Sequence, residues 1–288
     1  MNTTTLPGGT WTLGDSTITR FGYGAMQLAG PGVMGPPADQ DEARAVLRAA
    51  VEAGITHLDT SDAYGPRVTN RLIREALHPY PGPLLISTKV GAIRDPEGGW
   101  PVARQPQDLR RQVQENLDSL GLDILDLVTM RMGDANGPQP GPIAESMGAL
   151  VELQQEGLIR HLGVSNVTAA QVREAREVTD IVGVQNQYNL AHRGDDDLID
   201  ELAADGIAYI PFFPLGGFSP LQSQALSDVA DRVGATPMSV ALAWLLRRSP
   251  NILLIPGTSR TSHLRENIAG AAVTLSEQDL SELDSIGR

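Results

Sequence analysis

Three polar residues near the ends of predicted strands carry the side chains that proton transfer to an oxygen requires. Asp59 and Tyr64 follow one short apolar segment, and Lys89 ends another. When hydride reaches a carbonyl carbon, charge develops on the oxygen, so a positioned acid must supply a proton. A phenol titrates at about pH 10, so Tyr64 needs a neighbouring cation, which Lys89 can provide while Asp59 pairs with the lysine. The alternative is a packed tyrosine beside a structural Lys–Asp ion pair.

The elements that must position these residues are short apolar segments that alternate with helical patterns. The eight segments are residues 21–26, 56–60, 84–90, 124–130, 161–165, 181–185, 208–212 and 252–255. Amphipathic stretches such as 41–53 and 143–156 lie between them, each closed by a glycine. This alternation requires parallel strands, and eight units favour a closed barrel, whose active site lies at the carboxyl ends of the strands.

We therefore predict an α/β fold, a (β/α)8 TIM barrel with an N-terminal β-hairpin over residues 10–19, as one domain spanning 1–288. The alternative is an open sheet of six or seven strands, which the absence of a strand-turn-helix Gly-x-Gly-x-x-Gly motif disfavours. Glycine- and proline-rich segments at 30–37, 95–101 and 133–142 each follow a predicted strand, as functional loops of a barrel do. The acidic run 195–197 is expected to cap or solvate the start of a helix.

The segment Asp59-Thr-Ser-Asp-Ala-Tyr64-Gly resembles the signature of the aldo-keto reductases, and further matches follow in order along nearly the whole chain. They are Ser87-Thr-Lys89, Gly163-Val-Ser-Asn166, Gln185-Asn-Gln-Tyr-Asn189, and Ile255-Pro-Gly-Thr-Ser-Arg260 with Glu266-Asn267. The resemblance implies a barrel preceded by a hairpin, reduction of carbonyl compounds, usually NADPH as coenzyme, and catalytic roles for Asp59, Tyr64 and Lys89.

The resemblance also implies a set of coenzyme-binding residues. They are Met26, Ser165, Asn166, Gln185, Phe212, Pro214, Leu215, Gly216, Thr258, Ser259, Arg260, Glu266 and Asn267. Phe212 stands where the family has a ring stacked on the nicotinamide, with a core aromatic as the alternative. Residues 258–260 precede a predicted helix, so backbone N–H groups, hydroxyls and a guanidinium converge on a phosphate, which favours NADPH over NADH.

The fourth catalytic position of the family is usually histidine, and this chain has Arg131 there. Arginine cannot cycle a proton because it always carries charge. We expect Arg131 to orient an oxygen-rich substrate and stabilise developing negative charge; the alternative is a loop ion pair with Asp134.

Composition excludes several function classes. A formal net charge of −13 disfavours nucleic-acid and membrane-surface binding. Without cysteine there is no disulfide, thiolate metal site or cysteine nucleophile, and the histidine spacing gives no metal triad, so we predict no metal. With neither a signal-peptide pattern nor an apolar stretch of about 20 residues, the expected location is the cytoplasm. The expected partner is a small-molecule carbonyl substrate, and the expected state is a monomer.

Finer matches concern a smaller group, the bacterial pyridoxal reductases, which also carry arginine at the fourth position. The runs that match are 57–66, 68–77, 189–193 and 211–218. They imply reduction of pyridoxal to pyridoxine. Two alternatives stay open: a general aldehyde or ketone reductase, and a coenzyme-binding regulatory barrel whose turnover is incidental.

Overall fold

The computed structural model describes residues 6–134, 137–216 and 223–287. The strands are β1 (Thr10–Leu13), β2 (Ser16–Thr19), β3 (Tyr23–Gly24), β4 (His57–Asp59), β5 (Leu85–Val90), β6 (Leu125–Arg131), β7 (Ile159–Ser165), β8 (Gly183–Gln185) and β9 (Ala208–Tyr209). The helices are η1 (Ala25–Leu28), η2 (Pro31–Val33), α1 (Gln40–Glu52), α2 (Val68–Leu77), α3 (Pro106–Leu120), α4 (Ala144–Gln155), α5 (Ala169–Val178), α6 (Asp196–Ala204), α7 (Gln224–Val233), α8 (Pro237–Arg248), α9 (Thr261–Ala271) and α10 (Glu277–Leu283). Parts of the predicted loop 133–142 and of the run 211–218 lie outside the described residues.

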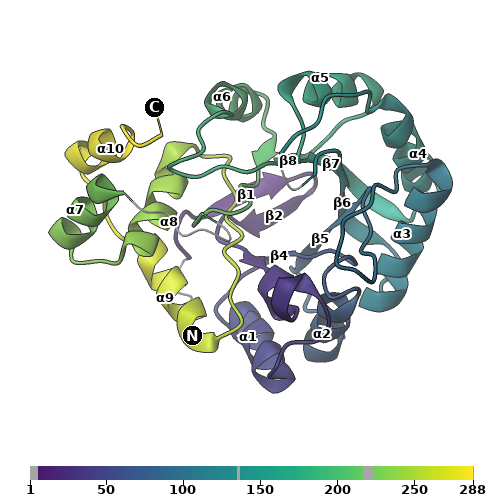
Figure 1. Ribbon diagram of the computed structural model, residues 1–288, viewed down its shortest axis with the longest axis horizontal. Helices are drawn as coiled ribbons and strands as arrows, with labels where there is room; N and C mark the ends of the chain where they lie inside the picture. Colours follow the sequence, from purple (N-terminus) through teal and green to yellow (C-terminus); the bar gives the residue numbers. More distant parts are fainter. Residues whose placement is uncertain (1–5, 135–136, 217–222, 288) are drawn as a thin grey trace.

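Seven strands form one parallel sheet in the order β3 to β9, and an eighth segment closes it. Residues 252–257 lie between the two edge strands, with parallel bridges from Ile252 to Tyr209 and from Leu254 to Phe21. Backbone hydrogen bonds join the same segments, from Gly22 N to Leu254 O at 2.8 Å and from Leu253 N to Tyr209 O at 2.9 Å. Helices surround the strands in Figure 1. The barrel prediction is confirmed, and the open-sheet alternative is wrong because both edges are paired.

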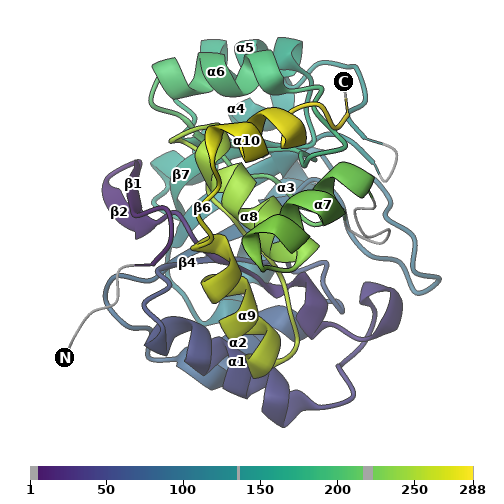
Figure 2. The same ribbon diagram turned by 90° about the vertical axis from the view of Figure 1, so that its left-hand side faces the viewer.

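The predicted hairpin, formed by β1 and β2, covers one end of the barrel. It appears in the centre of the ring of strands in Figure 1, and the side view of Figure 2 shows it at one margin of the molecule. Its buried Leu13 and Ile18 pack in one cluster with Leu85 and Ala208, the first residues of β5 and β9. The amino ends of the strands are therefore sealed, which leaves the carboxyl ends for a site.

The two helical stretches predicted at 41–53 and 143–156 form α1 (Gln40–Glu52) and α4 (Ala144–Gln155), within a residue or two at each end. Helix α1 begins after Asp39, whose carboxylate accepts a hydrogen bond from Glu42 N at 2.9 Å and so caps the helix. Its buried face consists of Ala43, Val46, Leu47 and Ala50. The spacing of three and four residues places these side chains on one stripe, which packs against the barrel.

Candidate active site

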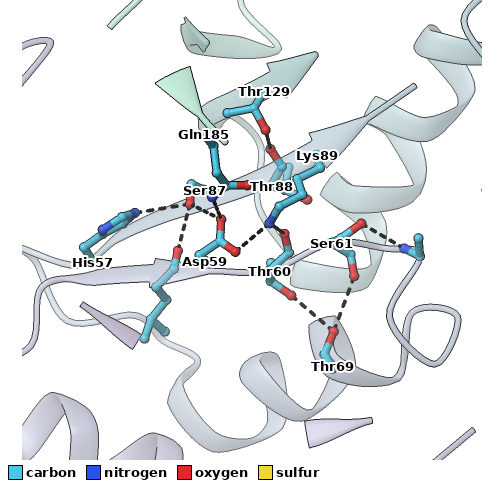
Figure 3. A network of polar contacts seen from close by, with 12 residues as sticks. His57, Asp59, Thr60, Ser61, Thr69, Ser87, Thr88, Lys89, Thr129 and Gln185 are labelled. Carbon is cyan, nitrogen blue, oxygen red and sulfur yellow. Dashed lines mark hydrogen bonds and ion pairs between the residues drawn. The ribbon is translucent and has the colours of Figure 1, made fainter. Parts of the chain in front are cut away.

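A buried carboxylate, Asp59, organises the carboxyl ends of neighbouring strands. Its Oδ2 accepts a hydrogen bond from Lys89 Nζ at 2.5 Å, and its Oδ1 accepts from Ser87 Oγ at 3.1 Å and from Gln185 Nε2 at 2.8 Å (Figure 3). Lys89 Nζ also donates to Thr60 O at 3.0 Å. Because β4, β5 and β8 are parallel strands of one barrel, residues far apart in sequence meet at this one carboxylate.

Lys89 keeps its positive charge in this setting. Burial acts against the ammonium, but the charge of Asp59, with Tyr64 as a second contributor, outweighs that effect and raises the pKa of Lys89. The ammonium nitrogen lies 5.3 Å from the centroid of the Tyr64 ring. The predicted group of Asp59, Tyr64 and Lys89 is therefore assembled, with a fixed cation beside the phenol.

Tyr64 owes its position to a tight turn after β4. Ala63 N donates to Ser61 Oγ at 3.2 Å, and Tyr64 N donates to Ser61 O at 3.1 Å. Val68 N then donates to Tyr64 O as α2 begins. The turn folds the tyrosine back over the strand ends.

A cavity of about 440 Å³ opens above these residues. All four predicted catalytic residues line it: Asp59, Tyr64, Lys89 and Arg131. Loops at all three predicted positions reach it, through Val33, Trp100 and Asp134 among others.

Arg131 is the last residue of β6, and its guanidinium carbon lies 4.9 Å from the centroid of the Trp100 ring. Burial lowers the pKa of Arg131, while the nearby Tyr64 and Asp134 act in the opposite direction. Arg131 therefore faces the cavity, and the charge of Asp134 lies near enough to act on its guanidinium.

Two side-chain amides leave buried oxygen atoms at this cavity. Gln185 Nε2 is held by Asp59, and Asn166 Nδ2 donates to Asp134 O at 2.8 Å. Gln185 Oε1 and Asn166 Oδ1 are buried and have no hydrogen-bond partner among the described residues. Unpaired buried acceptors are costly, so they mark the place of a donor. A carboxamide NH2 offers two donors, and these residues therefore fit a nicotinamide.

A close backbone approach makes room for one of these amides. A Cβ on Gly133 would lie 2.4 Å from Asn166 Cγ and Nδ2. Only glycine at position 133 lets the Asn166 side chain reach Asp134 O.

The remaining predicted coenzyme residues fall into three sets. Met26, Ser165, Phe212, Pro214 and Leu215 line the same cavity. Ser259 and Arg260 line a second cavity of about 650 Å³, which shares Met26, Gln27, Gly32 and Val33 with the first. Neither cavity is lined by Gly216, Thr258, Glu266 or Asn267 among the described residues.

Two backbone N–H groups at the start of α9 are already engaged. Arg260 N donates to Thr258 Oγ1 at 3.2 Å, and Thr261 N donates to Glu42 Oε1 at 2.7 Å. Glu42, a residue of α1 that was not predicted from sequence, lies beside the predicted phosphate position. The guanidinium of Arg260 and the Ser259 hydroxyl stay the candidates for that role.

Several cavity residues were not predicted from sequence. They include Trp100, Gln187 and Phe213, to which the sequence assigned no role, although Gln187 lies in the segment 185–189 and Phe213 in the run 211–218. Trp100 does lie in the predicted functional loop 95–101, so an aromatic residue in such a loop was the one available signal. In the part of the chain that the structure describes, no group of three or more His, Cys, Asp or Glu residues could hold a metal, and no helix is long and apolar enough to cross a membrane.

Comparison with known proteins agrees with this geometry. The model of the Aldo/keto reductase family matches residues 20–288. The chain is 60% identical over 281 residues to pyridoxine 4-dehydrogenase of Escherichia coli (strain K12), which covers 97% of this chain and 98% of that protein. It is 36% identical over 281 residues to an uncharacterized oxidoreductase of Schizosaccharomyces pombe, covering 97% of this chain and 90% of the relative.

Among solved structures, a thermostable aldo-keto reductase in complex with the inhibitor epalrestat has the same fold. It superposes with a TM-score of 0.81 at 30% sequence identity, covering 96% of this chain and 98% of that one. The chain therefore belongs to the aldo/keto reductase family and is an oxidoreductase.

Proposed function

We propose that this protein is a cytoplasmic, NADPH-dependent reductase that converts pyridoxal to pyridoxine. One observation carries the proposal: a single cavity holds a phenol beside a buried ammonium together with two unpaired amide oxygens. The relative named pyridoxine 4-dehydrogenase, at 60% identity, supports the choice of substrate. We further propose that residues 1–288 form one domain and act as a monomer.

In this proposal the coenzyme and the carbonyl substrate are held by different polar residues. NADPH supplies the hydride when it is bound. Asn166 Oδ1 and Gln185 Oε1 hold its carboxamide, and Arg260 with Ser259 holds its 2′-phosphate. Met26, Ser165, Phe212, Pro214, Leu215, Gly216, Thr258, Glu266 and Asn267 complete the proposed coenzyme set.

Tyr64 donates its hydroxyl proton to the carbonyl oxygen as charge develops there. The Lys89 ammonium stabilises the phenolate that is left, and Asp59 keeps the lysine charged and in place. General acid catalysis of this kind contributes about 10²- to 10⁴-fold to a rate.

Arg131 accounts for the choice among aldehydes. Pyridoxal carries a phenolate oxygen next to its aldehyde, and a permanently charged guanidinium can engage that oxygen without competing for the transferred proton. Steady-state kinetics of Arg131→His test this role, and we expect a higher KM for pyridoxal with a smaller change for simple aldehydes. Unchanged turnover and affinity for every aldehyde would remove Arg131 from the account.

A substrate panel tests the function as a whole. NADPH consumption is followed with pyridoxal, simple aldehydes and quinones, and pyridoxine is identified as product by chromatography. We expect pyridoxal to have the highest kcat/KM and NADPH to be preferred over NADH. Equal activity with all aldehydes would indicate a general reductase, and tight coenzyme binding with no turnover of any carbonyl would indicate a regulatory barrel.

A further inference from the structure

The two ends of the loop that follows β5, residues 91–103, are held together by hydrogen bonds. Ala103 N donates to Gly91 O at 3.0 Å. The fully buried Gln112 of α3 joins the same two residues, since its Oε1 accepts from Gly91 N at 2.9 Å and its Nε2 donates to Ala103 O at 2.8 Å. Both ends of the loop are thereby fixed to one helix.

Further bonds stiffen the loop towards its tip. Ile93 N donates to Pro101 O at 3.1 Å, and Asp95 Oδ1 accepts from Gly99 N at 2.5 Å. Arg94 donates to Gly98 O within the loop and to Gly32 O of η2, both at 2.7 Å. The residue between these bonds, Trp100, is therefore held in place before any substrate arrives.

Trp100 contacts the two groups that act on the carbonyl substrate. Its ring lies edge-on to the Tyr64 ring, with centroids 6.5 Å apart and an interplanar angle of 80°. The guanidinium carbons of Arg94 and Arg131 lie 4.2 Å and 4.9 Å from its ring centroid. Cations at such distances from an indole are attracted by its negative face. Trp100 therefore both lines the cavity and restrains Arg131.

We propose that Trp100 is a second specificity-determining residue of this cavity, acting together with Arg131. Its indole forms an aromatic wall beside Tyr64 and holds Arg131 towards the substrate, so the cavity favours a planar aromatic aldehyde with an oxygen anion next to the carbonyl. Small aliphatic aldehydes gain neither contact. The inference rests on the proposed function only in that Tyr64 is the proton donor to an aldehyde, and it does not require pyridoxal as the substrate.

Three probe aldehydes separate the two contacts. Salicylaldehyde places an ionisable hydroxyl next to the aldehyde, benzaldehyde has the ring without it, and propanal has neither. The ratio of kcat/KM for salicylaldehyde to benzaldehyde reports on Arg131, and the ratio for benzaldehyde to propanal reports on the aromatic wall.

The variants are Trp100→Leu, which removes the ring, and Trp100→Phe, which keeps an aromatic face. Val102→Ala is the matched control, because Val102 belongs to the same loop and is 63% exposed. For Trp100→Leu we expect both ratios to fall about tenfold, mainly through KM, because uniform binding is lost. We expect propanal turnover and the NADPH dissociation constant, measured by fluorescence, to stay within about threefold. Trp100→Phe should recover most of the benzaldehyde-to-propanal ratio, and Val102→Ala should match the wild type.

The proposal would be overturned if Trp100→Leu lowered kcat/KM by the same factor for all three aldehydes, or if it changed neither ratio. Failure of the pyridoxal assignment is a separate outcome. It is recognised when the wild type has no higher kcat/KM for pyridoxal than for the three probe aldehydes, while the two ratios still change in Trp100→Leu.

Discussion

The Asp59–Lys89 pair offers the sharpest energetic prediction. Both side chains are nearly removed from solvent, with 5% and 9% of their surface exposed, and the two charged atoms are 2.5 Å apart. Asp59→Asn leaves a buried ammonium without a counter-charge, and Lys89→Met leaves a buried carboxylate. Each change should cost about 3–5 kcal/mol in the free energy of unfolding, because an uncompensated buried charge is far more costly than a missing pair.

The double variant carries neither buried charge and should be more stable than the sum of the two losses implies. We expect a coupling energy of about 2–3 kcal/mol from urea unfolding of the four proteins at pH 7. The exposed pair Arg110–Glu156, with 51% and 46% of its side-chain surface exposed, serves as the matched control cycle. It should give about 0–1 kcal/mol, as surface ion pairs do. A coupling energy at Asp59–Lys89 no larger than that of the control would show that burial does not strengthen this ion pair.

The remaining predictions concern two buried titratable groups with opposite effects on stability. Burial, followed by the charge of Glu115, raises the pKa of Asp62 to about 7 from the ordinary value of 3.8. The contribution of Asp62 to the free energy of unfolding is therefore fully present below pH 3.8 and is lost as the pH rises through about 7. At about 1.4 kcal/mol per pKa unit, the loss of this contribution amounts to about 4 kcal/mol at most. The free energy of unfolding of Asp62→Asn, measured relative to the wild type, should therefore be higher at pH 8 than at pH 5. An equal effect of the substitution at both pH values would contradict a raised pKa of Asp62. Burial lowers the pKa of His57 from the ordinary value of 6.5 to about 4. The contribution of neutral His57 to the free energy of unfolding is therefore fully present above pH 6.5 and is lost as the pH falls through about 4. His57→Gln should therefore flatten the loss of unfolding free energy between pH 6.5 and pH 4, and an unchanged acid limb would speak against a neutral buried His57.

The barrel and the grouping of Asp59, Tyr64 and Lys89 at one cavity were predictable because each depends on a local pattern. Asp59, Tyr64 and Lys89 lie next to short apolar segments, and parallel pairing brings the ends of such segments together. The eighth segment was predicted as a strand as well, although the structure pairs it only through isolated bridges.

Contacts between distant loops and helices were not predictable in this way. Trp100 depends on Gln112 of α3 and on the bond from Arg94 to Gly32, which no spacing in the sequence reveals. The acidic run 195–197 begins α6 as expected, yet Asp195 makes no side-chain cap bond. Its carboxylate accepts from Asn186 Nδ2 and Tyr209 OH instead, because the barrel places those donors nearby.

Tyr64 is proposed above as the proton donor for carbonyl reduction. Tyr64→Phe removes one hydroxyl and keeps the ring that faces Lys89 and Trp100. NADPH affinity, measured by fluorescence titration, should be unchanged, while kcat for pyridoxal with NADPH falls at least about 100-fold. A Tyr64→Phe protein that binds NADPH normally and reduces pyridoxal within a few-fold of the wild-type rate would show that Tyr64 is not the proton donor.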